Sequence, residues 1–333
     1  MYHAIRNESF HFLVRKALTG KTFLALFVAT GCANRNAGPT SSNDSWARAS
    51  LNATAWVQTS EEYRGMAFSA YNQAKEQLDH ARFDPNWTAL PEQEGKDIDK
   101  LPLAVILDVD ETVLDNSAYQ AWIVLNKQQY SPETWDNWCS KIEATSVAGS
   151  PEFIKYTNEK DVKIFYLTNR NFADSQGREL EPKTIKNLKE VNLLPDQSFS
   201  DGELTFFNSA GVEIILNNAV LMKNEFIDWG SDKTSRRTLI AQNYRVALLL
   251  GDSLGDFTGY RTEGRSEDVY KALNPDAIND EMNNHSGRWG KSWIILPNPT
   301  YGSWERSLFG FMDDIPPNRK AALKESRLAP WKP

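Results

Sequence analysis

Three short apolar runs mark the middle of the chain. They are LAVILDV, VKIFYLT and VALLLGD, which end at residues 109, 168 and 252. Runs of Val, Ile and Leu of this length are typical of strands buried on both faces of a parallel sheet. Helical segments lie between them, including PKTIKNLKEV and KTSRRTLIAQN. Strand and helix in alternation predict an α/β fold with a Rossmann-like core, a parallel sheet flanked by helices.

A different pattern precedes the first of these strands. Residues 47–83 place apolar residues three and four positions apart and contain no proline, which predicts helix. An aromatic stripe of Trp56, Tyr63 and Tyr71 follows the same spacing and is best explained by core packing. We therefore expect one domain over residues 47–333, with a smaller helical subdomain built from 47–83 and part of the C-terminal segment.

The first 31 residues have the pattern of an export signal. Arg15, Lys16 and Lys21 precede the apolar stretch TFLALFVATG, which is too short to span a bilayer alone, and Cys32 follows at once. The ending ATGC resembles a bacterial lipoprotein signal, which would make Cys32 a lipidated N-terminus; a plain secretory signal is the alternative. Residues 32–46 then read as a flexible tether.

Charge and cysteine content restrict the function. A formal net charge of −7 argues against a nucleic-acid polymer as the main partner, so an anionic substrate needs a local positive site. Cys139 has no partner if Cys32 carries lipid, and it is better read as a small buried apolar residue than as a catalytic thiol. The four histidines lie in no zinc-binding pattern.

Polar residues follow each of the three strands. They are Asp108 and Asp110 after the first, Thr168, Asn169 and Arg170 after the second, and Asp252 and Asp256 after the third. In a doubly wound sheet, ligands bind beyond the carboxyl ends of the strands, so these side chains should face one another.

The two acids of DVD predict a cation site. Residues i and i+2 of an extended chain point to the same side, and two such carboxylates cannot both ionise freely unless a cation intervenes or one keeps its proton. Mg²⁺ takes oxygen ligands, for which Asp108, Asp252 and the backbone carbonyl of Asp110 are candidates. The metal-site prediction thus covers Asp108, Asp110 and Asp252, with Asp256 beside them.

This arrangement suits phosphoryl transfer. A free oxygen of Asp108 is a candidate nucleophile that would form an aspartyl phosphate, and Asp110 could protonate the leaving oxygen and then deprotonate water. Phosphoryl transfer mainly requires positioning and neutralisation of the phosphate oxygens. Mg²⁺, Lys233 and the Thr168 hydroxyl would provide that positive charge, with Asn169 as a further phosphate-binding candidate.

Each motif alone has a simpler explanation. DVDET is not an EF-hand, because Val113 and Tyr119 stand where that loop needs Gly and Glu, but it could be a strand-to-helix turn capped by Asp. YLTNR and GDSLGDF could likewise be ordinary turns. The three motifs in this order, each after a buried strand, favour a catalytic site.

The motifs together resemble a known family. DVDETVLDNSAYQ, FYLTNR, DKTSRR with Lys233, and LLLGDSLGDF are similar to the four motifs of the haloacid dehalogenase superfamily, and the chain resembles the class C acid phosphatases, which are bacterial surface lipoproteins. The resemblance implies that Asp108 is the nucleophile and Asp110 the acid/base. It also implies that Asp252 binds Mg²⁺ with support from Asp256, while Thr168 and Lys233 hold phosphate. A true dehalogenase has no need of the second Asp.

Two features depart from the family pattern. Ser253 and Gly255 replace the usual Asn and first paired Asp of the last motif, although Asp252 and Asp256 keep their spacing. Residues 196–231 are longer than the usual link and contain Lys223, a rival phosphate-binding lysine. We prefer Lys233, since it opens the helix before the strand that leads to Asp252.

The resemblance also implies a substrate class. The family acts on 5′-nucleotides and small aromatic phosphates at acidic pH, and Trp135 and Tyr301 could sandwich a nucleobase. Trp138 and Trp304 are expected in the core instead. The expected location is the bacterial cell envelope, as an outer-membrane lipoprotein, and the oligomeric state is left open with a homodimer among the options. Alternative functions are a non-catalytic ligand-binding lipoprotein and a phosphotransferase on the same scaffold.

Overall fold

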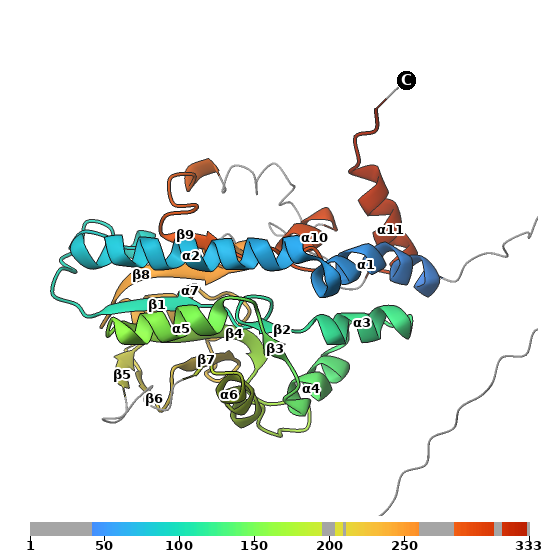
Figure 1. The fold of residues 1–333 in the computed structure, drawn as a ribbon. Helices are drawn as coiled ribbons and strands as arrows, with labels where there is room; N and C mark the ends of the chain where they lie inside the picture. The colour runs from blue at the N-terminus through green and yellow to red at the C-terminus, as the bar shows by residue number, and fades with distance from the viewer. Residues whose placement is uncertain (1–41, 195–203, 209–210, 260–282, 310–314, 332–333) are drawn as a thin grey trace, which may run out of the picture. The chain divides into compact units, whose positions relative to one another are not determined.

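The fold was analysed in a computed structural model that describes residues 42–194, 204–208, 211–259, 283–309 and 315–331. These residues belong to one compact unit that spans residues 40–333 (Figure 1). The predicted signal, Cys32 and most of the predicted tether lie outside the described residues, as do parts of the 196–231 segment. None of the helices in the described ranges is long and apolar enough to cross a membrane.

A parallel sheet forms the centre of the unit. Its five strands lie in the order β7-β4-β1-β8-β9, and every neighbouring pair is parallel. The bounds are β1 Leu103–Leu107, β4 Lys163–Asn171, β7 Val220–Lys223, β8 Arg245–Gly251 and β9 Trp293–Ile295. The three apolar runs thus supply the three central strands, and the predicted α/β fold class is confirmed.

Alternate residues of β1 enter two separate cores. Val105 and Leu107 belong to a core shared with α2 (Glu61–Phe83), α5 (Ser150–Glu159) and α6 (Glu181–Glu190), on one face of the sheet. Ala104 and Ile106 belong to the other core, which includes α7 (Thr234–Ile240) and the hairpin of β5 (Leu204–Phe207) and β6 (Glu213–Leu216). Burial on both faces explains why these strands are continuously apolar in sequence.

The helical segment before the sheet consists of two helices. The first, α1 (Ser42–Thr59), ends before Ser60, whose hydroxyl accepts a hydrogen bond from the Tyr63 backbone N–H at 3.1 Å and so caps the start of α2. Glu61 and Glu62 in the first turn of α2 favour this helix start. Helix α1 packs against α3 (Ser117–Leu125) and α11 (Pro317–Ser326), which come from distant parts of the sequence (Figure 1).

Shorter elements complete the end of the sheet where the strands finish. Figure 1 shows α3, α4 (Pro132–Lys141) and α10 (Ser303–Leu308) gathered there, with the two-stranded pair of β2 (Leu114–Asp115) and β3 (Thr145–Ser146) nearby. The turn η2 (Leu254–Asp256) follows β8, and η1 (Pro91–Gln93) precedes β1. The predicted site residues at the carboxyl ends of β1, β4 and β8 therefore lie at the end of the sheet where these helices gather.

Candidate active site

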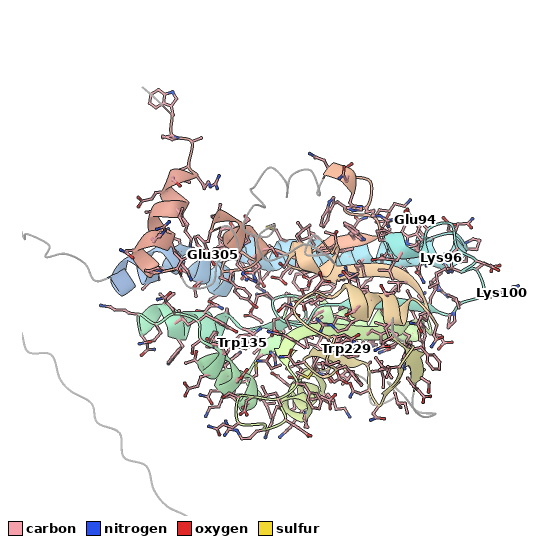
Figure 2. The ribbon with its side chains drawn as sticks, turned by 180° about the vertical axis from the view of Figure 1, so that it is seen from behind. Glu94, Lys96, Lys100, Trp135, Trp229 and Glu305 are labelled. Carbon is pink, nitrogen blue, oxygen red and sulfur yellow. The ribbon has the colours of Figure 1, made fainter. Side chains whose placement is uncertain are left out.

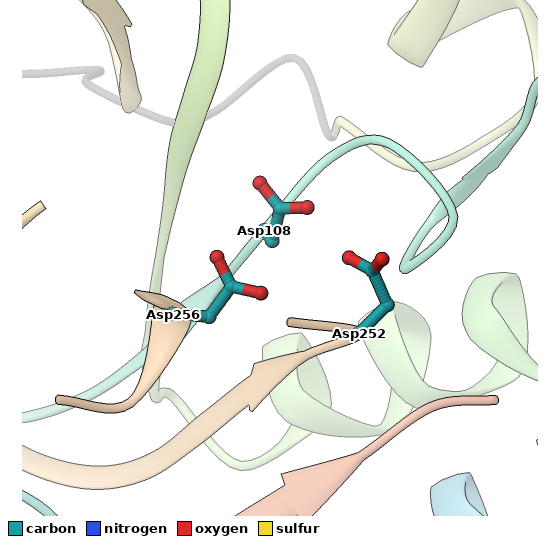
Figure 3. Close-up of side chains that lie close together, drawn as sticks. All are labelled: Asp108, Asp252 and Asp256. Carbon is teal, nitrogen blue, oxygen red and sulfur yellow. The ribbon is translucent and has the colours of Figure 1, made fainter. Parts of the chain in front are cut away.

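Three carboxylates converge at the carboxyl ends of the central strands. Asp108 follows β1, Asp252 follows β8, and Asp256 ends η2 (Figure 3). One oxygen from each lies within 4.8 Å of the others. The strand order puts β1 and β8 side by side, so residues 144 positions apart in the sequence meet here.

Gly251 allows this convergence. A Cβ atom at this position would lie 2.4 Å from both Cβ and Oδ2 of Asp256, closer than side-chain atoms can approach. Ser253 and Asp256 form a capping box, in which the Asp256 carboxylate accepts the Ser253 N–H at 2.9 Å. The family departure at Ser253 therefore has a structural use: its hydroxyl also pairs with that of Ser303 at 2.8 Å.

Lys233 places its ammonium group between two of the acids. This side chain is buried and donates to Oδ1 of Asp108 and, at 2.7 Å, to Oδ1 of Asp256. Lys233 is the residue directly before α7, as the sequence predicted. Lys223, the rival candidate, is the last residue of the edge strand β7 and is half-buried.

Burial controls the electrostatics of this cluster. Removal from water raises the pKa of Asp108 to about 7; Lys233 opposes the shift, while Asp256 and Asp110 add to it. Burial, together with Asp256 and Asp108, also raises the pKa of Asp252 well above its ordinary value. Asp252 is held by Asn298, which donates to Oδ2 at 2.8 Å. The oxygens of the three carboxylates are ligands of the kind that a hard cation takes.

Asp110 lies beside this cluster, in a network of its own. Its Oδ1 accepts hydrogen bonds from Arg170 Nε and Asn116 Nδ2, both at 2.9 Å, and Arg170 Nη2 lies 2.8 Å from the same oxygen. Its Oδ2 lies 3.4 Å from the Thr168 hydroxyl. The second predicted catalytic acid is thus held by the strand that supplies the predicted phosphate-binding residues.

Thr168 and Asn169 are placed differently. Thr168 is fully buried, and its hydroxyl accepts the Arg170 backbone N–H at 3.0 Å. Asn169 is exposed, with its side chain bonded to the Ser231 carbonyl at 3.2 Å and to Arg236 at 3.0 Å. Thr168 faces the acids, whereas the Asn169 side chain bridges two neighbouring segments of the site rim.

Four further residues make contacts in the site, although the sequence assigned no chemical role to them. They are Glu111, Asn116, Arg170 and Asn298. Glu111 and Asn116 lie inside DVDETVLDNSAYQ and Arg170 inside FYLTNR, so membership of a motif was the available signal for these three, whereas Asn298 lies three residues before Tyr301, the predicted stacking residue. Glu111 is buried and accepts the Asn116 backbone N–H at 2.9 Å. Its backbone adopts φ 56°, a conformation uncommon for residues other than glycine.

The aromatic residues differ in part from expectation. Trp135 is 9% exposed and packs edge-on against Tyr119 with ring centroids 5.1 Å apart, so base stacking on Trp135 would require its side chain to move. Tyr301 is half-buried. Trp304 was expected in the core, but it is 44% exposed, because its indole N–H reaches the carbonyls of Asn298 and Tyr301 at the surface. Trp138 is half-buried.

Cys139 is a buried, free cysteine in an apolar cluster with Tyr119, Ile123 and Trp135. Burial raises the pKa of its thiol to about 12, which leaves it protonated at neutral pH. The interpretation as a small buried apolar residue is confirmed.

The fold, and the pair of acids Asp108 and Asp110 that follow β1, are those of a phosphatase of the haloacid dehalogenase class. A family model described as HAD superfamily, subfamily IIIB (acid phosphatase) matches residues 26–304. The chain belongs to this family and is a phosphomonoesterase acting on small phosphoesters.

Solved structures agree with this assignment. The chain is similar to the class C acid phosphatase from Bacillus anthracis, at 29% identity over 86% of this chain and 100% of that chain, with a TM-score of 0.66. A crystal structure of the class C acid phosphatase from Bacillus anthracis with tungstate bound matches at 29% identity over the same shares of the two chains, with a TM-score of 0.65. The resemblance to class C acid phosphatases is therefore confirmed.

Proposed function

We propose that this protein is a Mg²⁺-dependent acid phosphatase that hydrolyses 5′-nucleotides and aromatic phosphomonoesters through an aspartyl phosphate on Asp108. The observation that carries the proposal is the convergence of Asp108, Asp252 and Asp256 (Figure 3), with the Lys233 ammonium bound to two of them, Asp108 and Asp256. A binding protein would not need a buried nucleophile with an acid beside it.

In the first step, an oxygen of Asp108 attacks phosphorus. The bond from phosphorus to the ester oxygen breaks as the bond to Asp108 forms, and Asp110 gives its proton to the departing oxygen. In the second step, water attacks phosphorus and passes a proton to Asp110, and the bond to Asp108 breaks. Inorganic phosphate leaves, and both acids return to their starting states.

Positive charge at the site favours the phosphate dianion. Lys233 and the Thr168 hydroxyl would contact its oxygens. Asp108, Asp252 and Asp256 would hold a divalent cation, which when bound supplies further neutralisation of charge on the phosphate. Mg²⁺ is proposed because all the candidate ligands are oxygens.

Substrate choice rests on the aromatic residues near the site. Tyr301 lies on the loop that also supplies Asn298, the partner of Asp252, and Trp304 in the first turn of α10 bonds to that loop, so a ring stacked on Tyr301 would be close to the phosphate site. We propose Tyr301, with Trp135 opposite it after a side-chain movement, as the nucleobase platform. The tungstate in the Bacillus anthracis enzyme is a tetrahedral oxyanion like phosphate, which supports a phosphate site in this fold. Export and lipid attachment at Cys32 in the cell envelope remain part of the proposal.

The test is phosphate release from a 5′-nucleotide and from an aromatic monoester, with Mg²⁺ and with chelator. Asp108→Asn should lower the rate at least about 1,000-fold, because the amide is a poor nucleophile. Asp84→Asn is the matched control: Asp84 caps a turn through the Asn86 N–H, away from the site, and should keep the parent rate. Full activity of Asp108→Asn, or no effect of the chelator, would contradict the proposed mechanism.

A further inference from the structure

The two oxygens of Asp110 have unequal surroundings. Oδ1 faces three donor nitrogens, from Arg170 Nε, Arg170 Nη2 and Asn116 Nδ2, at 2.8 to 2.9 Å. Oδ2 has the Thr168 hydroxyl at 3.4 Å, which is long for a hydrogen bond between oxygens. Oδ1 accepts two N–H hydrogen bonds and lies 2.8 Å from the positively charged Arg170 Nη2, so a proton on this carboxyl group belongs on Oδ2.

The donors around Oδ1 are themselves fixed. Arg170 is 1% exposed, and its guanidinium group lies 5.8 Å from the centre of the Trp135 ring. Asn116 is fully buried, and its Oδ1 accepts the Trp138 indole N–H at 2.8 Å and Arg170 Nη2 at 3.2 Å. Because both donors approach the amide oxygen, the amide nitrogen must point toward Asp110.

We propose that Arg170 and Asn116 are positioning residues that hold Oδ1 of Asp110 and reserve Oδ2 as the oxygen that carries the proton. This inference rests on the proposed function, in which Asp110 protonates the leaving oxygen. A carboxyl group that could turn would offer the proton to the substrate only part of the time. The guanidinium fork and the amide remove that freedom, and the Trp138 indole of α4, which donates to Asn116, supports the amide.

The experiment compares two substrates that differ in their need for a proton. A simple alkyl monophosphate has a leaving group that must be protonated, whereas 2,4-dinitrophenyl phosphate has one that leaves as an anion. The ratio of the two kcat/KM values reports on proton donation and is independent of the folded fraction of the sample. For Arg170→Met in the Mg²⁺-loaded full-length enzyme, we expect kcat/KM to fall about 100-fold for the alkyl ester and less than about 5-fold for the dinitrophenyl ester.

Milder variants and a matched control complete the test. Arg170→Lys keeps the charge but loses the fork, and Trp138→Phe removes one donor to Asn116; both should shift the ratio in the same direction, by less than Arg170→Met does. Arg245→Met is the control, because Arg245 is also a buried arginine of the sheet but binds the carbonyls of Ala81, Asp84 and Trp87 at the opposite strand end. It should leave the ratio unchanged.

The outcomes separate this inference from the proposed function. If Asp110→Asn shifts the ratio but the soluble Arg170 and Trp138 variants do not, the positioning role is wrong and the acid role of Asp110 stands. If Asp110→Asn does not shift the ratio either, the assignment of Asp110 in the proposed function fails first. A ratio that changes equally in Arg245→Met would also overturn the inference, because the effect would then not be specific to the arginine that contacts Asp110.

Discussion

Burial favours the protonated form of individual acids at this site, whereas water would favour the ionised form. Asp108 and Asp252 have raised pKa values because they are buried near other carboxylates. Glu111 shares this property: burial and the nearby Asp110 and Asp252 raise its pKa well above the ordinary value. The folded protein therefore keeps protons that the unfolded chain releases.

This imbalance predicts how stability depends on pH. For Asp108, the folded pKa of about 7 lies above the unfolded value of about 4, so between these pH values only the folded state binds the proton. The free energy of unfolding of the chelated protein should fall by about 1–4 kcal/mol from pH 4.5 to pH 8. Urea unfolding across this range, with chelator present, measures it.

A neutral variant provides the internal check. Asp252→Asn removes one of the buried charges, so its free energy of unfolding at pH 8 should exceed that of the chelated parent by about 1–3 kcal/mol, and its pH dependence should be flatter. Equal slopes for parent and variant would show that the carboxylates are better solvated than the structure indicates. Enzyme activity of this variant should be lost.

The sequence predicted the site residues that directly follow a strand better than it predicted the residues that hold those side chains in place. Asp108, Thr168 and Asp252 could be placed together because the carboxyl ends of neighbouring parallel strands meet. Arg170 was also expected there, but the contacts of Arg170 and Asn116 with Asp110 could not be predicted, since they depend on side-chain directions that spacing does not specify. Trp304 was misplaced for the same reason: α10 is only six residues long, too short for its sequence to show which face is buried.

At the level of elements, helix α2 directly supports the loop that follows β1 and carries Asp108 and Asp110. The Tyr71 side chain is fully buried, and its hydroxyl donates to the Thr112 backbone carbonyl at 2.6 Å. The hydroxyl oxygen of Thr112 in turn lies 3.4 Å from Oδ1 of Asp252. The helical segment before the sheet thus bears on the geometry of the site, a relation that its sequence periodicity did not reveal.

Removal of this hydroxyl should affect both stability and activity. Tyr71→Phe leaves the Thr112 carbonyl buried without its donor, so we expect a loss of about 1–3 kcal/mol in the free energy of unfolding and a several-fold lower kcat. Tyr156→Phe is the matched control, because the Tyr156 hydroxyl donates to Asp79 on the same helix but away from the loop. It should lower stability with little change in kcat; a similar fall in kcat would argue that α2 acts only through global stability.

For the whole molecule, metal binding and folding should be linked. A cation held by Asp108, Asp252 and Asp256 requires the folded arrangement of two segments that are distant in the sequence, those that follow β1 and β8. At about 100 times its dissociation constant, such a ligand adds about 2.7 kcal/mol to the free energy of unfolding. The Tm should therefore rise with Mg²⁺ concentration in the parent protein at pH 8.

Two variants test the linkage. Asp252→Asn should lose the Mg²⁺-dependent rise in Tm, whereas Asp84→Asn should keep it. A rise of the same size in all three proteins would indicate general salt effects in place of a site. Thermal unfolding followed by circular dichroism at constant ionic strength distinguishes these cases.

The packing of α1 against α11 has a consequence for the order in which the chain folds. These helices lie side by side, yet residues 59 and 317 are separated by most of the chain (Figure 2). Such a contact closes a very long loop, and high contact order slows folding. During synthesis α1 cannot contact α11 until residues 317–326 have been translated, and β1 cannot pair with β8 until residues 245–251 have been translated. Helix α1 therefore lacks its contact with α11 for nearly the whole of translation. During this time its apolar face is available to a chaperone that binds exposed apolar helices.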